Sequence, residues 1–127
     1  AADDELDRPL HYTAMLGDMA MATLLLQHNA RINERNKAGE TPLFAAMMYE
    51  HTKVAALLLT ERANANVLVN GQSVLYCACE RGLADIILLL LANTTDVNAK
   101  HNGFSPLATA VVGGHADVAA LLLTSPH

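Results

Sequence analysis

The chain repeats itself four times at a nearly constant spacing. The leucines that mark the repeats lie 33, 32 and 32 residues apart, at Leu10, Leu43, Leu75 and Leu107. A run of three leucines follows fourteen residues after each of them, beginning at or including Leu24, Leu57, Leu89 and Leu121. Asparagines recur in register at Asn33, Asn66 and Asn98. A fixed period of this length indicates an array of small units, each of which buries its core against its neighbours.

Each repeat predicts two short helices and a turn. Thr41 can cap the start of a helix, and Pro42 suits the first helical turn, where its missing N–H costs nothing. Glycines that can take a left-handed conformation stand where the first helix of a repeat should end, at Gly17, Gly82 and Gly114. Leucines at helical spacing then predict a second helix. The loops that follow end in Asn-Gly or a similar pair, which is typical of a tight hairpin turn.

Four segments, "GETPLFAA", "RPLHYTA", "GGHADVAALLL" and "DVNAKHNG", resemble the ankyrin repeat family. The resemblance extends over about residues 3 to 127 and recurs four times in register. It implies an all-α fold, an ankyrin-repeat solenoid of stacked antiparallel helix pairs with projecting β-hairpin loops. We divide the chain into repeats at 3–35, 36–67, 68–99 and 100–127, and expect them to form a single domain over residues 1–127.

Several positions depart from the family pattern. Glu50 replaces the glycine of the turn in the second repeat, and Asn29, Arg62 and Thr94 replace the glycine that follows the second helix. If Arg62 and Thr94 keep a positive φ, each stores backbone strain, because side chains with a Cβ are disfavoured there.

Composition excludes several classes of function. The formal net charge is −5, with eight Lys and Arg against thirteen Asp and Glu, so nucleic acid is not an expected partner. Apolar runs such as Ile86 to Ala92 are far shorter than the roughly 20 residues that span a bilayer, and no membrane insertion is expected. Cys77 and Cys79 lie too close together to cross-link loops. They favour a reducing, intracellular setting, cytoplasmic with the nucleus left open.

The sequence gives no combination of residues that supports catalysis. The Cys-x-Cys pair lacks the spacing and the further ligands of a zinc site, so burial is the better interpretation and no metal is expected. In the resemblance, His11 falls at a position that hydrogen-bonds between repeats, and His51 and His115 fall at the turn. The segment "GFSPLATAVVGGH" lacks the endings of a phosphate loop or a nucleophile elbow. We therefore predict that the chain is not an enzyme and needs no cofactor.

The recurring asparagines have a structural explanation, since their side-chain amides can hold a turn by bonding the backbone. Ankyrin-repeat proteins are also substrates of an asparaginyl hydroxylase at this position. In "LLLANTTDVNA", Asn98 is the candidate for that modification.

A partner protein is expected on a concave face, because the resemblance implies contacts from loop tips and the exposed sides of the first helices. Met15 with Leu16, and Met48 with Tyr49, occupy equivalent places in adjacent repeats and predict a contiguous apolar strip. The alternative is that a neighbouring loop covers these side chains. The predicted contact residues are Asp7, Met15, Leu16, Lys37, Glu40, Met48, Tyr49, Gln72, Glu80, Arg81, His101, Phe104 and Val112. Negative charge at Asp4, Glu5, Asp7 and Glu40 favours a basic rim on the partner.

Three functional hypotheses follow. The first is a non-catalytic protein–protein interaction module, an adaptor or scaffold. The second is a regulatory or substrate-recruiting ankyrin domain of a larger multidomain enzyme. It is favoured by the start at Ala1 without methionine and by the apolar last helix. Because that helix is as apolar as the internal second helices, we expect a fragment of a longer array or a terminus that a partner covers. The third is self-association through the apolar C-terminal repeat, "DVAALLLTSPH".

Overall fold

Two compact units make up the chain, residues 1–64 and 65–127, and each holds two of the four repeats. The structure, a computed structural model, describes residues 2–93, 100, 101 and 103–124, without the side chains of residues 2–8. Each unit is described by itself. The predicted combination of the repeats into one domain concerns how the units join, and it stays a prediction.

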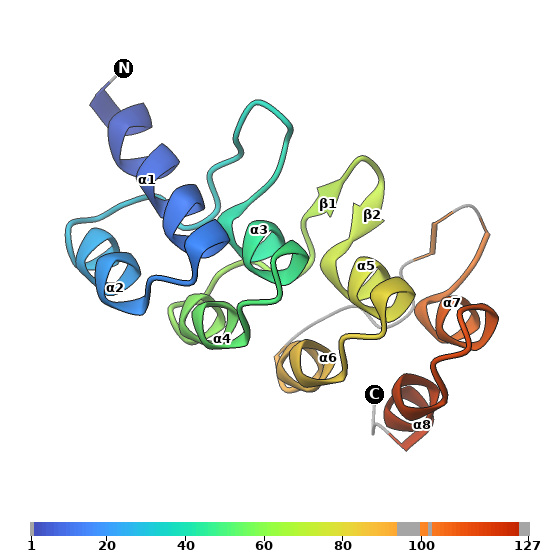
Figure 1. Cartoon of the computed structure of the whole chain (residues 1–127). Helices are drawn as coiled ribbons and strands as arrows, with labels where there is room; N and C mark the ends of the chain where they lie inside the picture. The colour runs from blue at the N-terminus through green and yellow to red at the C-terminus, as the bar shows by residue number, and fades with distance from the viewer. Residues whose placement is uncertain (1, 94–99, 102, 125–127) are drawn as a thin grey trace. The chain divides into compact units, whose positions relative to one another are not determined.

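The first unit consists of four helices, α1 (Ala2–Leu16), α2 (Met19–Gln27), α3 (Pro42–Met48) and α4 (Thr52–Thr60). Helix α1 packs on α3 and α2 packs on α4, so that the repeats lie side by side (Figure 1). The core includes the fully buried side chains of Leu10, Leu43, Val54 and Leu58. The landmark leucines Leu10 and Leu43 are therefore core residues of this unit.

The second unit begins with a hairpin of β1 (Leu68–Val69) and β2 (Gln72–Ser73). Asn70 and Gly71 connect the strands, and both have a positive φ, as a type I′ turn requires. Four helices follow, α5 (Val74–Arg81), α6 (Ala84–Leu91), α7 (Pro106–Val112) and α8 (Ala116–Thr124). Helix α5 packs on α7 and α6 packs on α8. The hairpin predicted from the Asn-Gly pair is confirmed in this loop.

The first helix of three repeats, namely α3, α5 and α7, begins after a residue whose side-chain hydroxyl caps it. The Thr41 hydroxyl accepts a hydrogen bond from the backbone N–H of Phe44, as predicted. The Ser73 hydroxyl accepts one from Tyr76, and that of Ser105 accepts one from Ala108. In the first repeat Arg8 stands at the cap position and has no acceptor to offer. Helix α1 accordingly runs back to Ala2 with Pro9 inside it, which places Asp7 on a helix rather than in a loop.

The helix ends confirm the predicted glycines. Gly17, Gly82 and Gly114 all have φ between 72° and 75°. The substituted positions keep the same conformation without glycine, with φ of 60° at Glu50 and 70° at Arg62. Thr94 lies outside the described residues. The expected strain is therefore present at Arg62, since a left-handed conformation is costly for a residue with a Cβ.

No helix within residues 2–93 or 103–124 combines the length and the apolar character needed to cross a bilayer.

Candidate functional site

The predicted apolar strip lies at the ends of two packed helices in the first unit. Leu16, at the end of α1, is 76% exposed, and Tyr49, directly after α3, is 54% exposed. Met15 and Met48 are half-buried. Met47, which the sequence did not single out, is the methionine of α3 that is fully buried. Two large apolar side chains are thus open to solvent where α1 and α3 end.

A histidine ties these two helix ends together. The Nε2–H of His51 donates a hydrogen bond to the carbonyl oxygen of Met15 over 2.8 Å. The imidazole lies so close to Gly17 that a Cβ at that glycine would stand 2.6 Å from His51 Nδ1. Equivalent contacts occur in the second unit, where His115 Nε2 lies 3.1 Å from the carbonyl oxygen of Glu80. The histidines predicted to be structural are structural in both places.

Next to the strip is a hollow of about 370 Å³ between α1 and the first loop. It is lined by His11, Tyr12, Met15, Asn36, Lys37 and Ala38. His11 is buried, and its Nε2 lies 2.8 Å from the carbonyl oxygen of Glu40, so the loop is fastened to α1. Tyr12 is 58% exposed and is the aromatic residue among those of the lining.

Hydrogen bonds between Asn36 and Glu40 close the tip of the first loop. Asn36 N–H donates to the Glu40 carbonyl, and the Asn36 Oδ1 accepts from the N–H groups of Ala38 and Glu40. The Asn36 Nδ2 also donates to the Glu40 carboxylate over 3.2 Å. Because Asn36 and Glu40 close the loop, Lys37 is held at an exposed three-residue tip beside the hollow.

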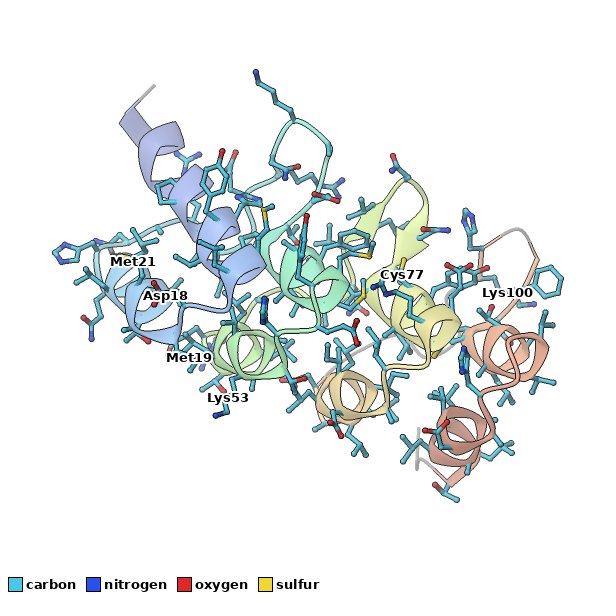
Figure 2. The ribbon with its side chains drawn as sticks, viewed as in Figure 1. Asp18, Met19, Met21, Lys53, Cys77 and Lys100 are labelled. Carbon is cyan, nitrogen blue, oxygen red and sulfur yellow. The ribbon has the colours of Figure 1, made fainter. Side chains whose placement is uncertain are left out.

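Tyr12 is an exposed aromatic residue beside the predicted strip that sequence reasoning missed. It stands two residues after its landmark leucine, where the other repeats carry smaller residues that are buried, at Ala45, Cys77 and Thr109. A large aromatic residue at a position that otherwise holds small ones is the signal that could have found it. Sequence reasoning also missed three exposed apolar side chains on α2, Met19, Met21 and Leu24. Figure 2 labels Met19 and Met21.

The predicted residues of the second unit differ in how far they are exposed. Gln72 Oε1 accepts a hydrogen bond from the Cys77 thiol over 3.3 Å. His101 is half-buried and packs edge-on against the Tyr76 ring, with 5.2 Å between ring centres. Glu80, Arg81, Phe104 and Val112 are exposed. The side chain of Asp7 and the whole of Asn98 lie outside the described part of the chain.

The two cysteines have the properties of core residues. Both are buried. Burial, reinforced by Glu80 and opposed by Arg81, raises the pKa of Cys77 to about 11, and burial raises the pKa of Cys79 to about 12. Both thiols are therefore protonated at neutral pH and poor nucleophiles. The described residues contain no group of three or more His, Cys, Asp or Glu side chains placed to hold a metal ion.

One of the recurring asparagines, Asn33, links two loops in the first unit. Asn33 Oδ1 accepts the backbone N–H of Asn64 over 2.8 Å, which joins the loop of one repeat to the loop of the next. This bond supports the structural explanation for Asn33.

Comparison with known proteins agrees with this architecture. The family model for ankyrin repeats in three copies matches residues 2–69 and again 61–127. The chain belongs to the ankyrin repeat family. The predicted fold class, all-α ankyrin repeats built from helix pairs with hairpin loops, is confirmed. Ankyrin repeats are protein-interaction modules, and nothing in the described residues shows catalysis.

The chain is similar to parts of much larger proteins. The probable E3 ubiquitin-protein ligase XBOS33 of Oryza sativa subsp. japonica is 37% identical over 80 residues, which is 61% of this chain and 15% of that protein. The E3 ubiquitin-protein ligase XBAT33 of Arabidopsis thaliana is 38% identical over 85 residues, 65% of this chain and 16% of that protein. Human ankyrin repeat domain-containing protein 13C is 39% identical over 57 residues, 45% of this chain and 10% of that protein.

Proposed function

We propose that the chain is a non-catalytic interaction module that binds a partner protein over the strip of Met15, Leu16, Met48 and Tyr49 and the adjacent hollow. The observation that carries the proposal is the exposure of Leu16 and Tyr49 at the joined ends of α1 and α3. Neither side chain is needed for the core, and burying large apolar groups on binding is favourable.

The chemistry of the surface describes the partner. Tyrosine offers a large apolar contact area with few rotatable bonds. Methionine offers an apolar contact area with a flexible, polarisable sulfur. The hollow beside Tyr12 and Met15 fits an apolar side chain of the partner. The basic rim expected on the partner rests on Glu40 and on the acidic residues of the sequence at Asp4, Glu5 and Asp7. Lys37 at the loop tip can form an ion pair with one carboxylate of the partner.

The test replaces exposed side chains only. Leu16→Ser with Tyr49→Ser should abolish capture of the partner, identified by pull-down with mass spectrometry from native-source lysate. Circular dichroism and the melting temperature should stay nearly unchanged, because both side chains are exposed. Met21→Ser with Leu24→Ser on α2 is the matched control, since it removes two exposed apolar side chains from the same unit. Loss of capture in the control but not in the strip variant would refute the site.

A second candidate function is substrate recruitment within a larger enzyme. It is favoured by the match to two proteins named as E3 ubiquitin ligases over about 15% of their length. The complete transcript decides this candidate: a catalytic domain in the same reading frame supports it, and a complete frame without one rejects it. We also propose a cytoplasmic location, consistent with the two free thiols, which fluorescence imaging of the tagged native protein would test.

A third proposal is self-association of the chain through its fourth repeat, where Val112 and Leu123 are exposed. Analytical sedimentation at two concentrations tests it. A monomer at both concentrations would reject it.

A further inference from the structure

Asn70 and Gly71 form the exposed turn between β1 and β2, at the end of the hairpin away from α5 (Figure 1). Both residues have a positive φ, 53° and 79°. An asparagine before a glycine is open to intramolecular attack, in which the backbone nitrogen of the glycine adds to the side-chain amide carbon of the asparagine. The glycine favours this attack because it places no Cβ beside the nitrogen.

An imidazole from the next loop lies beside this turn. A Cβ built on Gly71 would stand 3.6 Å from His101 Nδ1 and 3.8 Å from its Cε1. The Gly71 nitrogen is one bond from that Cα, so Nδ1 can reach its N–H directly or through one water. In the neutral tautomer protonated on Nε2, Nδ1 accepts a proton. Gly39 and Gly103 in the neighbouring loops would meet nothing within 4 Å.

His101 is held in place independently of the hairpin. Its ring packs edge-on against Tyr76, a buried residue of α5, and its backbone exchanges two hydrogen bonds of 3.0 Å with Phe104. The strands β1 and β2 contain two residues each, and a hairpin this short opens easily. The turn can therefore rotate into the reactive conformation while the imidazole stays where it is.

We propose that Asn70 is a site of deamidation and isoaspartate formation, with His101 as the general base. The Gly71 nitrogen forms a bond to Cγ of Asn70 while its proton passes to Nδ1 of His101. The bond from Cγ to Nδ2 then breaks, and the imidazole returns the proton to the departing ammonia. Water opens the resulting succinimide ring at either carbonyl, which gives aspartate or isoaspartate. One water is consumed and one ammonia is released, and no oxidant or other reagent takes part.

The modification alters the loop that carries it. Isoaspartate adds one methylene to the backbone, and both products replace a neutral amide with a carboxylate. A two-residue turn cannot absorb the longer link, so the pairing of Leu68 with Ser73 and of Val69 with Gln72 is lost. Gln72 then leaves the Cys77 thiol, which donates to it over 3.3 Å. This change lies in the second unit and does not depend on the strip proposed above.

The test follows the two Asn-Gly pairs of the same chain. The folded 127-residue chain is incubated at neutral pH, digested with trypsin, and analysed by fragmentation that distinguishes isoaspartate from aspartate. Asn70 lies in the tryptic peptide 63–81, and Asn102 before Gly103 is the matched control, because Gly103 has no imidazole beside it. Asn70 should deamidate about tenfold faster than Asn102 in the folded chain. In urea the two rates should be similar.

Two variants isolate the imidazole. His101→Phe keeps an aromatic ring against Tyr76 but removes the base, so it should slow deamidation of Asn70 by about tenfold without changing the circular dichroism. In His101→Ala, added imidazole should restore the rate. Deamidation of Asn70 at the native rate in His101→Phe would overturn the proposal. So would an Asn70 that keeps its amide in the folded chain while it reacts in urea, since the turn would then be protected by the fold.

Discussion

His51 reaches back 36 residues to hold the carbonyl oxygen of Met15, and its ring fills the space that a side chain on Gly17 would need. The bond and the close contact act together, since the ring can approach the carbonyl only because Gly17 has no Cβ. This pair of residues therefore couples the first repeat to the second.

Gly17→Ala should lower the free energy of unfolding by about 2–4 kcal/mol, because it adds a clash with His51 to the strain of a positive φ. Gly39→Ala is the matched control: Gly39 has φ of 80°, but a Cβ there meets nothing within 4 Å. The control should lose only about 1–2 kcal/mol. Urea denaturation measures both, and equal losses would show that the histidine contact is not limiting.

Met47→Ala and Met48→Ala separate core from surface within one helix. Met47 is fully buried, so its truncation should cost about 2–5 kcal/mol. Met48 is half-buried, so its truncation should cost less than half as much while weakening partner capture. Thermal melts and pull-down of both variants provide the measurements. A larger loss of stability from Met48→Ala would identify Met48 as a core residue and remove it from the strip.

Arg62→Gly should raise the free energy of unfolding by roughly 1 kcal/mol, because it removes the Cβ that strains a left-handed conformation at an exposed residue. Asn29→Gly changes the equivalent residue of the first repeat, where φ is 68°. Asparagine tolerates this conformation better than arginine, so the gain at Asn29 should be smaller. Chemical denaturation compares the two, and a loss of stability in Arg62→Gly would show that its side chain contributes more than its backbone costs.

Native Cys77 should react with iodoacetamide at pH 8 about a hundredfold more slowly than in the unfolded chain. Burial raises its pKa from 9.0 to about 11, and each unit lowers the thiolate fraction tenfold. Cys79, with a pKa of about 12, should react more slowly still. Mass spectrometry of peptides labelled with and without urea gives the two rates. Native labelling at the unfolded rate would show that α5 opens readily.

The same thiols set a pH dependence of stability. Their pKa is higher in the folded than in the unfolded state, so the folded chain holds more protons between about pH 9 and 11 to 12. Stability from this source is complete below pH 9 and falls as the pH rises through that window. Cys77→Ala with Cys79→Ala should flatten the decline.

Much of the fold could be predicted because the repeats carry the same local signals for where helices begin and end. Thr41 and Pro42 fixed the start of α3, and Gly17 and Gly82 fixed the ends of α1 and α5. The start of α1 at Ala2 was not predicted. Arg8 offers no hydroxyl cap that would mark a helix start there, and the effect of an absent cap is harder to anticipate than the presence of one.

The candidate site was less predictable, since exposure depends on contacts between elements. The sequence placed Met48 and Tyr49 outside the repeat pattern, but it could not separate exposed Tyr49 from half-buried Met48. Tyr12 was not predicted as part of the site, because it lines the hollow together with loop residues that are distant in the sequence. The hydrogen bond from His11 to the Glu40 carbonyl brings that loop to α1.

Asn36 and Glu40 also determine where this chain can change length. Their hydrogen bonds close the first loop beneath Lys37, Ala38 and Gly39, and the 33-residue spacing of the first two leucines reflects this one-residue longer tip. The extra residue is accommodated above the closure, so the helices on either side keep their register. Further residues inserted after Ala38 should be tolerated in the same way, which makes this tip a place where new recognition sequences can be added without rebuilding the repeats.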